Sequence, residues 1–463
     1  MMSVNTFPLS DVLAVAKIHP FYNPTAEYPP DPEAIQSAVQ SAQQVSTAVD
    51  LTGLPLIGKK DLYKVIARLT DDTNPKNEYR RSSYVSITGG GSGGLPLMFM
   101  TDTQENRKQR AVFGDFLRTC GVVESHDWVL TTHVSGYFYR SLDLLSEILE
   151  NAGATVLSAG NFMTPAEVVR ALAHYHVNVL TGDGSQVVQV VHHISTLSAE
   201  ERSQIRLTKV LYTSEPLTVS QRSHITAVLG PVKICSVWGS AEAGPCAISN
   251  PDLTGDDCPP GTTDFVIDTR NVIIEILPTS ASEGDSPSAA KPVPDGEEGI
   301  IVQTSLQRRR NPLVRYITGD VGSLQPLPEA ARAIVPEAEL KHLRVLRLRG
   351  RDRRFSFKWY GAYFDFENIV GLMQTEKSGI LQWQVVLGSL ESSPQTKLEI
   401  RLLREVDSDH IMPKDDLVKL LETFFFVMPE SEHLFQITFL NSLAGFEKSS
   451  TGNKVMKFVD RVH

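Results

Sequence analysis

Short apolar runs alternate with longer amphipathic segments between residues 101 and 240. Apolar runs of this length indicate strands, and apolar residues three and four positions apart indicate helices. The expected strands are 128–132, 177–181, 209–213 and 232–237. The expected helices are 103–118, 141–151, 165–175, 185–194 and 217–229. Strands that alternate with helices in this way predict a largely parallel sheet, in which ligands bind beyond the carboxyl ends of the strands.

Local signals support two of the helix starts. Asp102 precedes the first helix as a cap, because its side-chain oxygen can accept from the first backbone N–H groups. Thr164-Pro165-Ala166-Glu167 has the pattern of a capping box with proline at the first helical position.

The pattern differs on both sides of this segment. Residues before about 80 are rich in turns, with helices expected at 32–49 and 60–69. Residues 250–349 favour strands and turns, with strands expected at 265–267, 272–277 and 300–303. After Arg349-Gly350-Arg351, helices are expected at 367–373 and 414–426, and strands at 384–387, 397–403 and 435–439.

A chain of 463 residues is too long for one core, so two domains are expected. We predict an α/β fold with a large amino-terminal domain, residues 1–349, that contains mixed and parallel sheets and a β-rich subdomain. A small α+β domain, residues 350–463, follows it.

Composition narrows the functional classes. The net charge of −10 is spread along the chain, which argues against a nucleic-acid binder. The basic run Arg308-Arg309-Arg310 is short and is expected to be a solvated edge. No apolar run reaches about 18 residues, so no membrane span is expected. The first residues lack the pattern of a signal peptide, and a cytoplasmic location is therefore expected.

The four cysteines, Cys120, Cys235, Cys246 and Cys258, are too few for a disulfide framework in a chain of this length. Cys246 and Cys258 could contribute to a metal site, but no Cys-x2-Cys pair or nearby histidine supports one. Whether these two cysteines bind a metal stays open at this point.

The segment Ser86-Ile-Thr-Gly-Gly-Gly-Ser-Gly-Gly-Leu-Pro-Leu97 is the strongest candidate for a ligand-binding loop. Glycines let backbone N–H groups converge on an anion, and hydroxyl groups add donors for phosphate oxygens. Leu95 and Pro96 stand where a Walker loop needs Lys and Ser/Thr. A dinucleotide fingerprint must open a helix, whereas a return strand is expected here. A phosphate-binding hairpin and a plain surface hairpin both remain open.

Two further candidate segments follow expected strands. One is Thr213-Ser214-Glu215-Pro216-Leu217, and the other is Trp238-Gly239-Ser240-Ala241-Glu242. Trp238 offers a flat face for a base, and Gly239 allows close approach of the backbone. Ser240 can donate to a phosphate, and Glu242 is a hard oxygen ligand for Mg²⁺. Each segment alone is equally compatible with an ordinary strand-to-helix loop.

Three charged residues in the later part of the chain are further candidates. Asp320, in Arg315-Tyr-Ile-Thr-Gly-Asp320, can accept from ribose hydroxyls. Arg351 lies at the domain junction, and Lys454 lies in the flexible segment Lys448-Ser-Ser-Thr-Gly-Asn-Lys454. An Asp turn, a solvated hinge charge and a surface lysine are the plain alternatives.

Taken in order, these motifs resemble the acyl-adenylate-forming superfamily, and most closely phenylacetate–CoA ligase and its relatives. Pro20-Phe21-Tyr22 and Leu54-Pro-Leu-Ile-Gly-Lys-Lys-Asp-Leu62 are similar to the opening of that subfamily. The resemblance covers nearly the whole chain. It implies a domain that binds ATP and a carboxylic acid, followed by a mobile carboxyl-terminal lid.

The resemblance also implies roles for individual residues. The phosphate loop would comprise Thr88, Gly89, Gly90, Gly91, Ser92, Gly93 and Gly94. The nucleotide would further contact Ser214, Glu215, Pro216, Trp238, Gly239, Asp320 and Arg351, with Ser240 at a phosphate. Glu242 would bind Mg²⁺, and Lys454 would assist attack of the carboxylate, with Lys448 and Lys457 as alternatives. The stretch with His133, Tyr137 and Phe138 would line the acid pocket.

The function implied is ATP-dependent activation of a carboxylic acid, aryl or otherwise flat, as an acyl-AMP, followed by transfer to CoA. One alternative is an amide synthetase that uses an amine acceptor, and another is a non-catalytic nucleotide-binding descendant. A homodimer is compatible with the sequence. Neither nucleic acid nor membrane is expected as a partner.

Overall fold

The structure is a computed structural model. It describes residues 6–44, 50–88, 97–136, 138–214, 217, 219–255, 258–259, 262–282, 290–351, 356–373, 375, 377–390, 395–404, 411–447 and 455–462. These residues form two compact units, one on each side of the boundary between Asp352 and Arg353. Among the described residues, no helix is long and apolar enough to cross a membrane.

The first unit is built on one sheet of 11 strands in the order β12-β13-β14-β15-β11-β10-β9-β8-β7-β3-β6. The parallel strands are β3 (Trp128–Thr131), β6 (Thr155–Ser158), β7 (Val179–Asp183), β8 (Lys209–Thr213) and β9 (Lys233–Ser240). The antiparallel strands are β10 (Gly244–Ser249), β11 (Thr263–Asp268), β12 (Val272–Leu277), β13 (Gly299–Ser305), β14 (Tyr316–Gln325) and β15 (Leu343–Arg351). The predicted α/β class is confirmed, and the β-rich region continues the same sheet.

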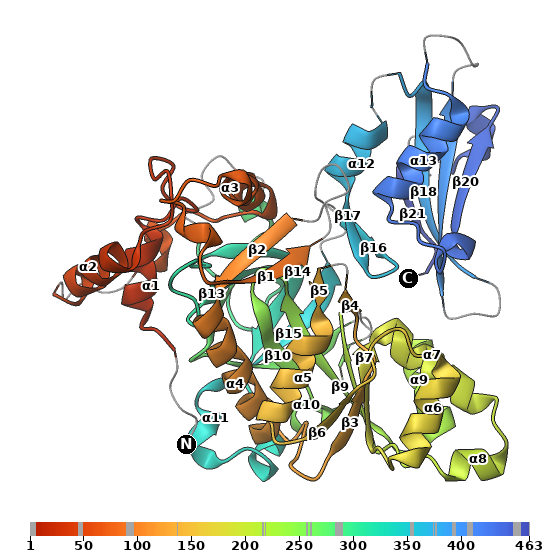
Figure 1. Ribbon diagram of the computed structural model, residues 1–463, viewed down its shortest axis with the longest axis horizontal. Coiled ribbons are helices and arrows are strands. Elements are labelled where there is room, and N and C mark those ends of the chain that lie inside the picture. Colours follow the sequence, from red (N-terminus) through yellow and green to blue (C-terminus); the bar gives the residue numbers. More distant parts are fainter. Residues whose placement is uncertain are drawn as a thin grey trace. The chain divides into compact units, whose positions relative to one another are not determined.

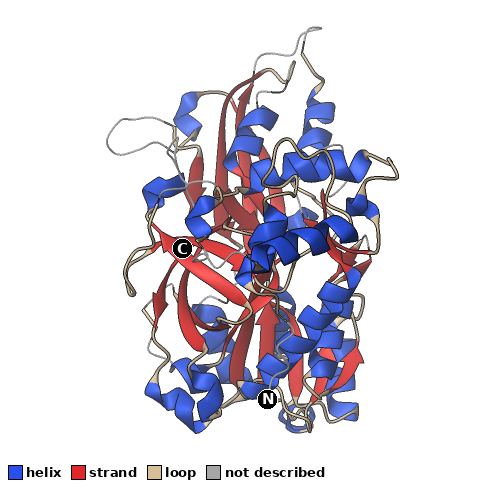
Figure 2. Cartoon of the chain, turned by 90° about the vertical axis from the view of Figure 1, so that its left-hand side faces the viewer, coloured by secondary structure: helices blue, strands red, loops and turns tan. Residues whose placement is uncertain are grey.

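Helices cover both faces of the parallel strands (Figures 1 and 2). One layer is α4 (Thr103–Thr119) and α5 (Ser141–Asn151). The other is α6 (Pro165–His174), α7 (Gly184–Ser195) and α9 (Val219–Leu229). Neighbouring strand residues face opposite layers: Val129 joins the core under α4 and α5, whereas Leu130 joins the core under the other layer. Two covered faces explain why consecutive residues in the middle of these strands are apolar.

The predicted helix starts are confirmed. Asp102 Oδ1 accepts from the backbone N–H groups of Gln104 and Glu105 at 2.8 and 3.1 Å, and Thr164 with Glu167 forms the capping box. The strand β15 was not predicted, because alternating leucine and arginine in Leu343–Arg351 resembles a charged hinge more than a strand. Short helices α8 (Ala199–Ser203), α10 (Pro251–Thr254) and α11 (Glu337–Leu340) complete the connections.

The amino-terminal segment packs on a hairpin at one side of the first unit. It contains α1 (Leu9–Ala16), α2 (Pro32–Gln43) and α3 (Lys59–Asp71), and the hairpin is β1 (Ser83–Thr88) with β2 (Leu97–Asp102). Leu62, Ile66 and Leu69 occur four and three positions apart on α3, and their shared face packs in one core with Phe99 of β2. The hairpin therefore has a fixed base.

The second unit has its own core. A four-stranded sheet in the order β20-β19-β18-β21 carries two helices and a hairpin (Figure 1). The strands are β18 (Ile380–Ser389), β19 (Thr396–Arg404), β20 (Phe435–Leu440) and β21 (Phe458–Asp460), with β16 (Ser356–Trp359) and β17 (Ala362–Asp365) as the hairpin. The helices are α12 (Phe366–Met373) and α13 (Lys414–Phe424). Ile369 of α12 and Leu417 of α13 lie in the core with Ile400 of β19.

The arginine run at 308–310 is not a solvated edge, and that prediction was wrong. Arg308 is 1% exposed, donates to the backbone oxygen of Glu242 and lies over the ring of Phe99, with 5.3 Å between guanidinium and ring centre. Burial lowers the pKa of Arg308 to about 10, while the charges of Glu105 and Glu242 oppose this shift. The run is a connection between β13 and β14 that the hairpin and α4 bury.

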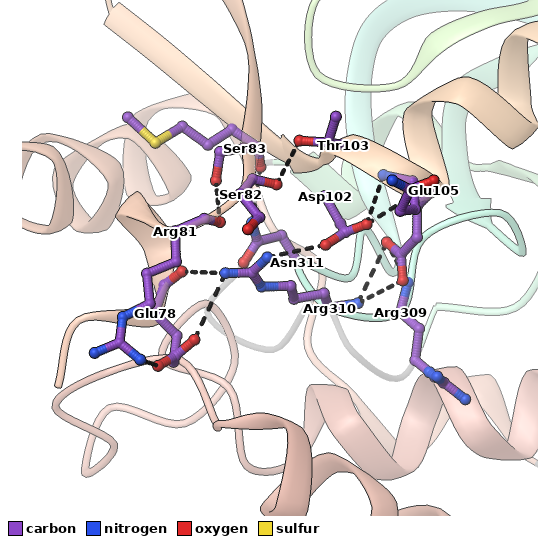
Figure 3. A network of polar contacts seen from close by, with 12 residues as sticks. Glu78, Arg81, Ser82, Ser83, Asp102, Thr103, Glu105, Arg309, Arg310 and Asn311 are labelled. Atoms are coloured by element: carbon purple, nitrogen blue, oxygen red, sulfur yellow. Dashed lines mark hydrogen bonds and ion pairs between the residues drawn. The ribbon is translucent and has the colours of Figure 1, made fainter.

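Arg310 ties this connection to the base of the hairpin (Figure 3). Its guanidinium donates to Asp102 Oδ2 at 2.9 Å and to the backbone oxygen of Glu78 at 2.6 Å. The side chain of Arg309 points out of this network in Figure 3 and lies over the ring of Phe7 at 4.5 Å. One guanidinium thus joins the end of β2 with the turn before β1.

Glu105, in the first turn of α4, closes the network. Its carboxylate accepts from the backbone N–H groups of Arg309 and Arg310, each at 3.2 Å. Burial raises the pKa of Glu105 from 4.5 to about 7; the N–H group of Arg309 opposes this and the charge of Asp102 adds to it. The protein therefore folds with a carboxyl group that holds its proton more tightly than in the unfolded chain.

This difference predicts a pH dependence of stability. Between pH 4.5 and 7 the folded chain binds more protons at Glu105 than the unfolded chain, so the free energy of unfolding should fall as the pH rises and level off above 7. The fall is at most on the order of 3 kcal/mol. Urea titrations at several pH values should show that Glu105→Gln removes this component.

The matched control is Glu33→Gln, since Glu33 lies in the first turn of α2 and is exposed. It should leave the pH profile of stability unchanged. Parallel profiles for the wild-type chain and Glu105→Gln would contradict the assignment of the titration to Glu105.

Candidate functional site

The carboxyl ends of β7, β8 and β9 form the edge at which the candidate residues gather. The three strands are parallel neighbours, so Asp183, Thr213 and the end of β9 lie on the same side of the sheet. Ser214 follows β8 directly, and Trp238, Gly239 and Ser240 are the last residues of β9. Ser214 follows a strand as predicted, whereas Trp238, Gly239 and Ser240, which were expected after a strand, lie inside β9 at its end.

Strands β1 and β2 flank the glycine segment in the sequence. Strands β1 and β2 pair antiparallel, with Thr88 opposite Leu97, which excludes the helix that a dinucleotide fingerprint requires. Residues Gly89, Gly90, Gly91, Ser92, Gly93 and Gly94 lie outside the described residues, and so do Tyr137, Glu215, Pro216, Lys448 and Lys454. Their assigned roles stay predictions.

A hairpin, not a strand-to-helix loop, follows β9. β9 returns antiparallel as β10, with Ser240 opposite Gly244. A side chain at Gly239 would place its Cβ 2.5 Å from the backbone oxygen of Gly244 and 2.7 Å from Cα of Pro245, so the close strand crossing already requires glycine there. The Ser240 hydroxyl accepts from the backbone N–H of Ala243 at 3.1 Å and stabilises the turn.

Glu242 lies in this turn and is buried, with 5% of its surface exposed. The Tyr63 hydroxyl donates to its Oε1 atom. Burial by itself would raise the pKa of Glu242, but the charge of Lys59 and the bond from Tyr63 outweigh burial and hold the pKa below its ordinary value. Glu242 is therefore an ionised carboxylate at neutral pH.

An ionised carboxylate is the donor that Mg²⁺ prefers, so the chemistry of Glu242 fits the predicted metal. The residues around it were not singled out from the sequence. Lys59 and Tyr63 lie on α3, far away in the chain, and Arg308 reaches the same turn from the β13–β14 connection. No local pattern marks such a contact.

Cys246 lies on β10, the strand that pairs with the end of β9. The Cys246 thiol donates to the backbone oxygen of Trp238 at 3.6 Å. Burial raises the pKa of this thiol to about 12; a bond with Gln303 opposes the shift and the charge of Asp320 adds to it. Trp238 is partly buried against the core of the antiparallel strands, so part of its ring is covered.

Asp320 lies within β14 and not after a strand, which corrects the expected placement. It is 7% exposed, and its backbone N–H donates to the Thr318 hydroxyl at 3.1 Å. Arg351 pairs with Asp320 across β14 and β15. The two residues assigned to the ribose are thus direct neighbours in the sheet, although they are 31 positions apart in the sequence.

His133 is fully buried and has partners at both ring nitrogens. Its Nδ1 atom lies 2.9 Å from the Thr131 hydroxyl, and its Nε2 atom lies 2.9 Å from the Thr213 hydroxyl. Phe138 and Tyr139 follow in a short hairpin of β4 (Ser135–Gly136) and β5 (Tyr139–Arg140), and they are 62% and 46% exposed. Neither ring belongs to a hydrophobic core of the first unit.

Lys457, an alternative to Lys454, lies in the second unit. Its ammonium group donates to Gln382 Oε1 and lies over the Trp383 ring, 4.5 Å from the ring centre. Burial lowers the pKa of Lys457. A lysine with these partners has a local role in its own unit, so Lys454 remains the preferred candidate.

The cysteines give no support to a metal centre. All four are free, and among the described residues the only group of three potential ligands is Glu124, His126 and Asp127. Lys209 already binds the carboxylates of Glu124 and Asp127 at 2.7 and 2.8 Å. This group is a partly exposed ion-pair network in which only Asp127 is buried, and Cys246 and Cys258 take no part in it.

No family model matches the sequence, and no curated protein matches it. Solved structures do match. A crystal structure of 2-hydroxyisobutyryl-CoA ligase, in complex with 2-HIB-AMP and CoA in the thioesterification state, is similar over 98% of this chain and 88% of that chain, with 16% identity and a TM-score of 0.69.

Amide bond synthetase McbA from Marinactinospora thermotolerans is similar over 97% of this chain and 91% of that chain, with 13% identity and a TM-score of 0.53. Identities this low establish the fold and leave the reaction to be argued from the site. The chain has the fold of the acyl-adenylate-forming enzymes.

Proposed function

We propose that this chain uses ATP and Mg²⁺ to activate a carboxylic acid as an acyl-AMP and then transfers the acyl group to CoA. The observation that carries the proposal is the buried, ionised carboxylate of Glu242 in the same β9–β10 hairpin as Trp238, in a fold shared with a CoA ligase that was captured with 2-HIB-AMP and CoA. Both residues belong to a segment that was a candidate from the sequence.

The residues have complementary tasks in this chemistry. A free carboxylate is a poor electrophile, and conversion to a mixed anhydride with AMP supplies a leaving group. The ionised carboxylate of Glu242 would hold Mg²⁺, which offsets phosphate charge. Asp320 and Arg351 would orient the ribose, and Trp238 would offer its uncovered face to the base. Lys454 would stabilise charge on the transferring phosphoryl group.

The acid is proposed to be aryl or otherwise flat, since Phe138 and Tyr139 expose aromatic faces beside the strand end that carries His133. The resemblance of the sequence motifs to phenylacetate–CoA ligase is in line with an aryl acid as substrate. Three further statements stay predictions. They are the roles of the two domains as an ATP-binding domain and a lid, the cytoplasmic location and the homodimer.

Amide synthesis is the second candidate. It uses the same adenylate, and the similarity in fold to an amide bond synthetase favours keeping it. The two candidates differ only in the nucleophile that attacks the acyl-AMP, and the described residues do not distinguish them. A non-catalytic nucleotide-binding chain is the third.

The first half-reaction is tested by pyrophosphate exchange. In the presence of ATP, Mg²⁺ and a suitable acid, the chain should move radioactive pyrophosphate into ATP, because adenylate formation is reversible. The panel should contain aryl acids, short hydroxy acids and fatty acids, with the strongest exchange expected for an aryl acid. Absence of acid-dependent exchange across the panel would favour the non-catalytic alternative.

The same preparation then decides the acceptor. With the selected acid, CoA should accelerate AMP release and yield a thioester. Acceleration by amines with CoA inert would replace the proposed ligase with the amide synthetase, and it would leave the adenylation step intact.

Glu242→Gln tests the metal ligand. Glutamine keeps the shape and can still accept from Tyr63, but it loses the charge that Mg²⁺ requires. The Mg²⁺ concentration for half-maximal exchange should rise roughly tenfold or more. The control is Glu33→Gln, which removes an exposed carboxylate in the first turn of α2 and should leave the Mg²⁺ requirement unchanged. An unchanged requirement in Glu242→Gln would make Glu242 a structural residue only.

A further inference from the structure

A chain of hydrogen bonds runs from the core to the surface at the carboxyl ends of β3, β7 and β8. The buried His133 lies 2.9 Å from the Thr213 hydroxyl. Thr213 donates to Asp183 Oδ1 at 3.3 Å, and the exposed Ser214 donates to the same oxygen at 2.7 Å. Asp183 was not among the candidates from the sequence, because it is an ordinary helix-start residue before α7.

The Thr213 hydroxyl has three partners. It lies 2.9 Å from His133 Nε2, 3.3 Å from Asp183 Oδ1 and 3.2 Å from the Ser214 hydroxyl. The carboxylate of Asp183 only accepts, so the Ser214 hydroxyl donates to it. Burial lowers the pKa of His133, with the charge of Asp183 opposing, so the ring is neutral.

Ser214 has an unusual backbone conformation at the exposed end of this chain. Its φ angle is +70°, in the left-handed region that residues other than glycine rarely adopt. Such strain persists only where surrounding contacts hold it, and it is frequent at ligand sites. The short bond from Ser214 to Asp183 is a contact that can hold it.

We propose that Asp183 is a positioning residue for the nucleotide: its carboxylate holds Ser214 in the left-handed conformation and so fixes the direction of the backbone groups of Ser214 at the end of β8. This inference rests on the proposed function, since it assigns Ser214 to the ATP site. Ser214 then acts through its backbone conformation, and its hydroxyl is occupied by Asp183 and does not itself contact the nucleotide.

Two substitutions at one position separate these roles. Ser214→Ala and Ser214→Gly both remove the hydroxyl, but alanine retains the cost of the left-handed conformation and glycine does not. If the conformation matters, Ser214→Ala should weaken ATP binding roughly 5- to 30-fold, and Ser214→Gly should weaken it only a few-fold. Equal weakening in both variants would show direct binding by the hydroxyl and overturn the proposal.

Asp183→Ala should weaken ATP binding about as much as Ser214→Ala, and adding Ser214→Gly to Asp183→Ala should restore most of the affinity. Asp183→Asn is the conservative control, because the amide oxygen can still accept from Ser214. Kd for Mg–ATP is measured on the full chain by calorimetry without any acid, and thermal unfolding is measured alongside. If the variants were only structurally damaged, their unfolding temperatures would fall, but the Kd of Ser214→Ala would not exceed that of Ser214→Gly.

The outcomes also separate this inference from the proposed function. Unchanged affinity in Asp183→Ala, or a double variant that stays weak, overturns the positioning role while the wild-type chain still binds ATP. A wild-type chain that does not bind ATP contradicts the proposed function, and the nucleotide role of Asp183 with it.

Discussion

The ionised carboxylate of Glu242 is the constraint on which the rest of the site depends. A buried charge is costly unless cations and donors surround it. Lys59 and Tyr63 supply them from α3, while Arg308 binds the backbone of the same residue from the β13–β14 connection. The turn that carries the candidate metal ligand is therefore contacted by α3 and by the β13–β14 connection. These segments must fold together with the turn after β9.

The same arginine run fixes the glycine hairpin at its base. Arg310 joins Asp102 at the end of β2 to Glu78 before β1, and Glu105 holds the backbone of the run in return. Phosphate loops gain from many backbone donors, and glycine lets these donors converge on an anion. Arg308 and Arg310, which the sequence pattern assigned to a solvated edge, thus form contacts between segments inside the first unit.

Periodic and local signals were sufficient for much of the fold. The cap at Asp102, the capping box at Thr164 and the strand at 209–213 were predicted because each depends on residues close in sequence. The strand-to-helix loop considered for Trp238 to Glu242 is a hairpin instead, since β9 returns as β10. The close approach of Gly244 requires glycine at 239, and the sequence alone does not separate this cause from a ligand. Lys59, Tyr63, Arg308 and Asp183 were missed because their roles arise only from contacts between distant segments, which no single-sequence pattern encodes.

The central claim is that the carboxylate of the acid attacks ATP. The transfer of a carboxyl oxygen from the acid to AMP measures this most directly. The acid selected by exchange is labelled with oxygen-18 in its carboxyl group and incubated with ATP, Mg²⁺ and the acceptor. Because the acyl–oxygen bond breaks when the acceptor attacks, the account predicts AMP that carries one labelled oxygen in its phosphate. Unlabelled AMP, or label in inorganic phosphate together with ADP, would contradict it.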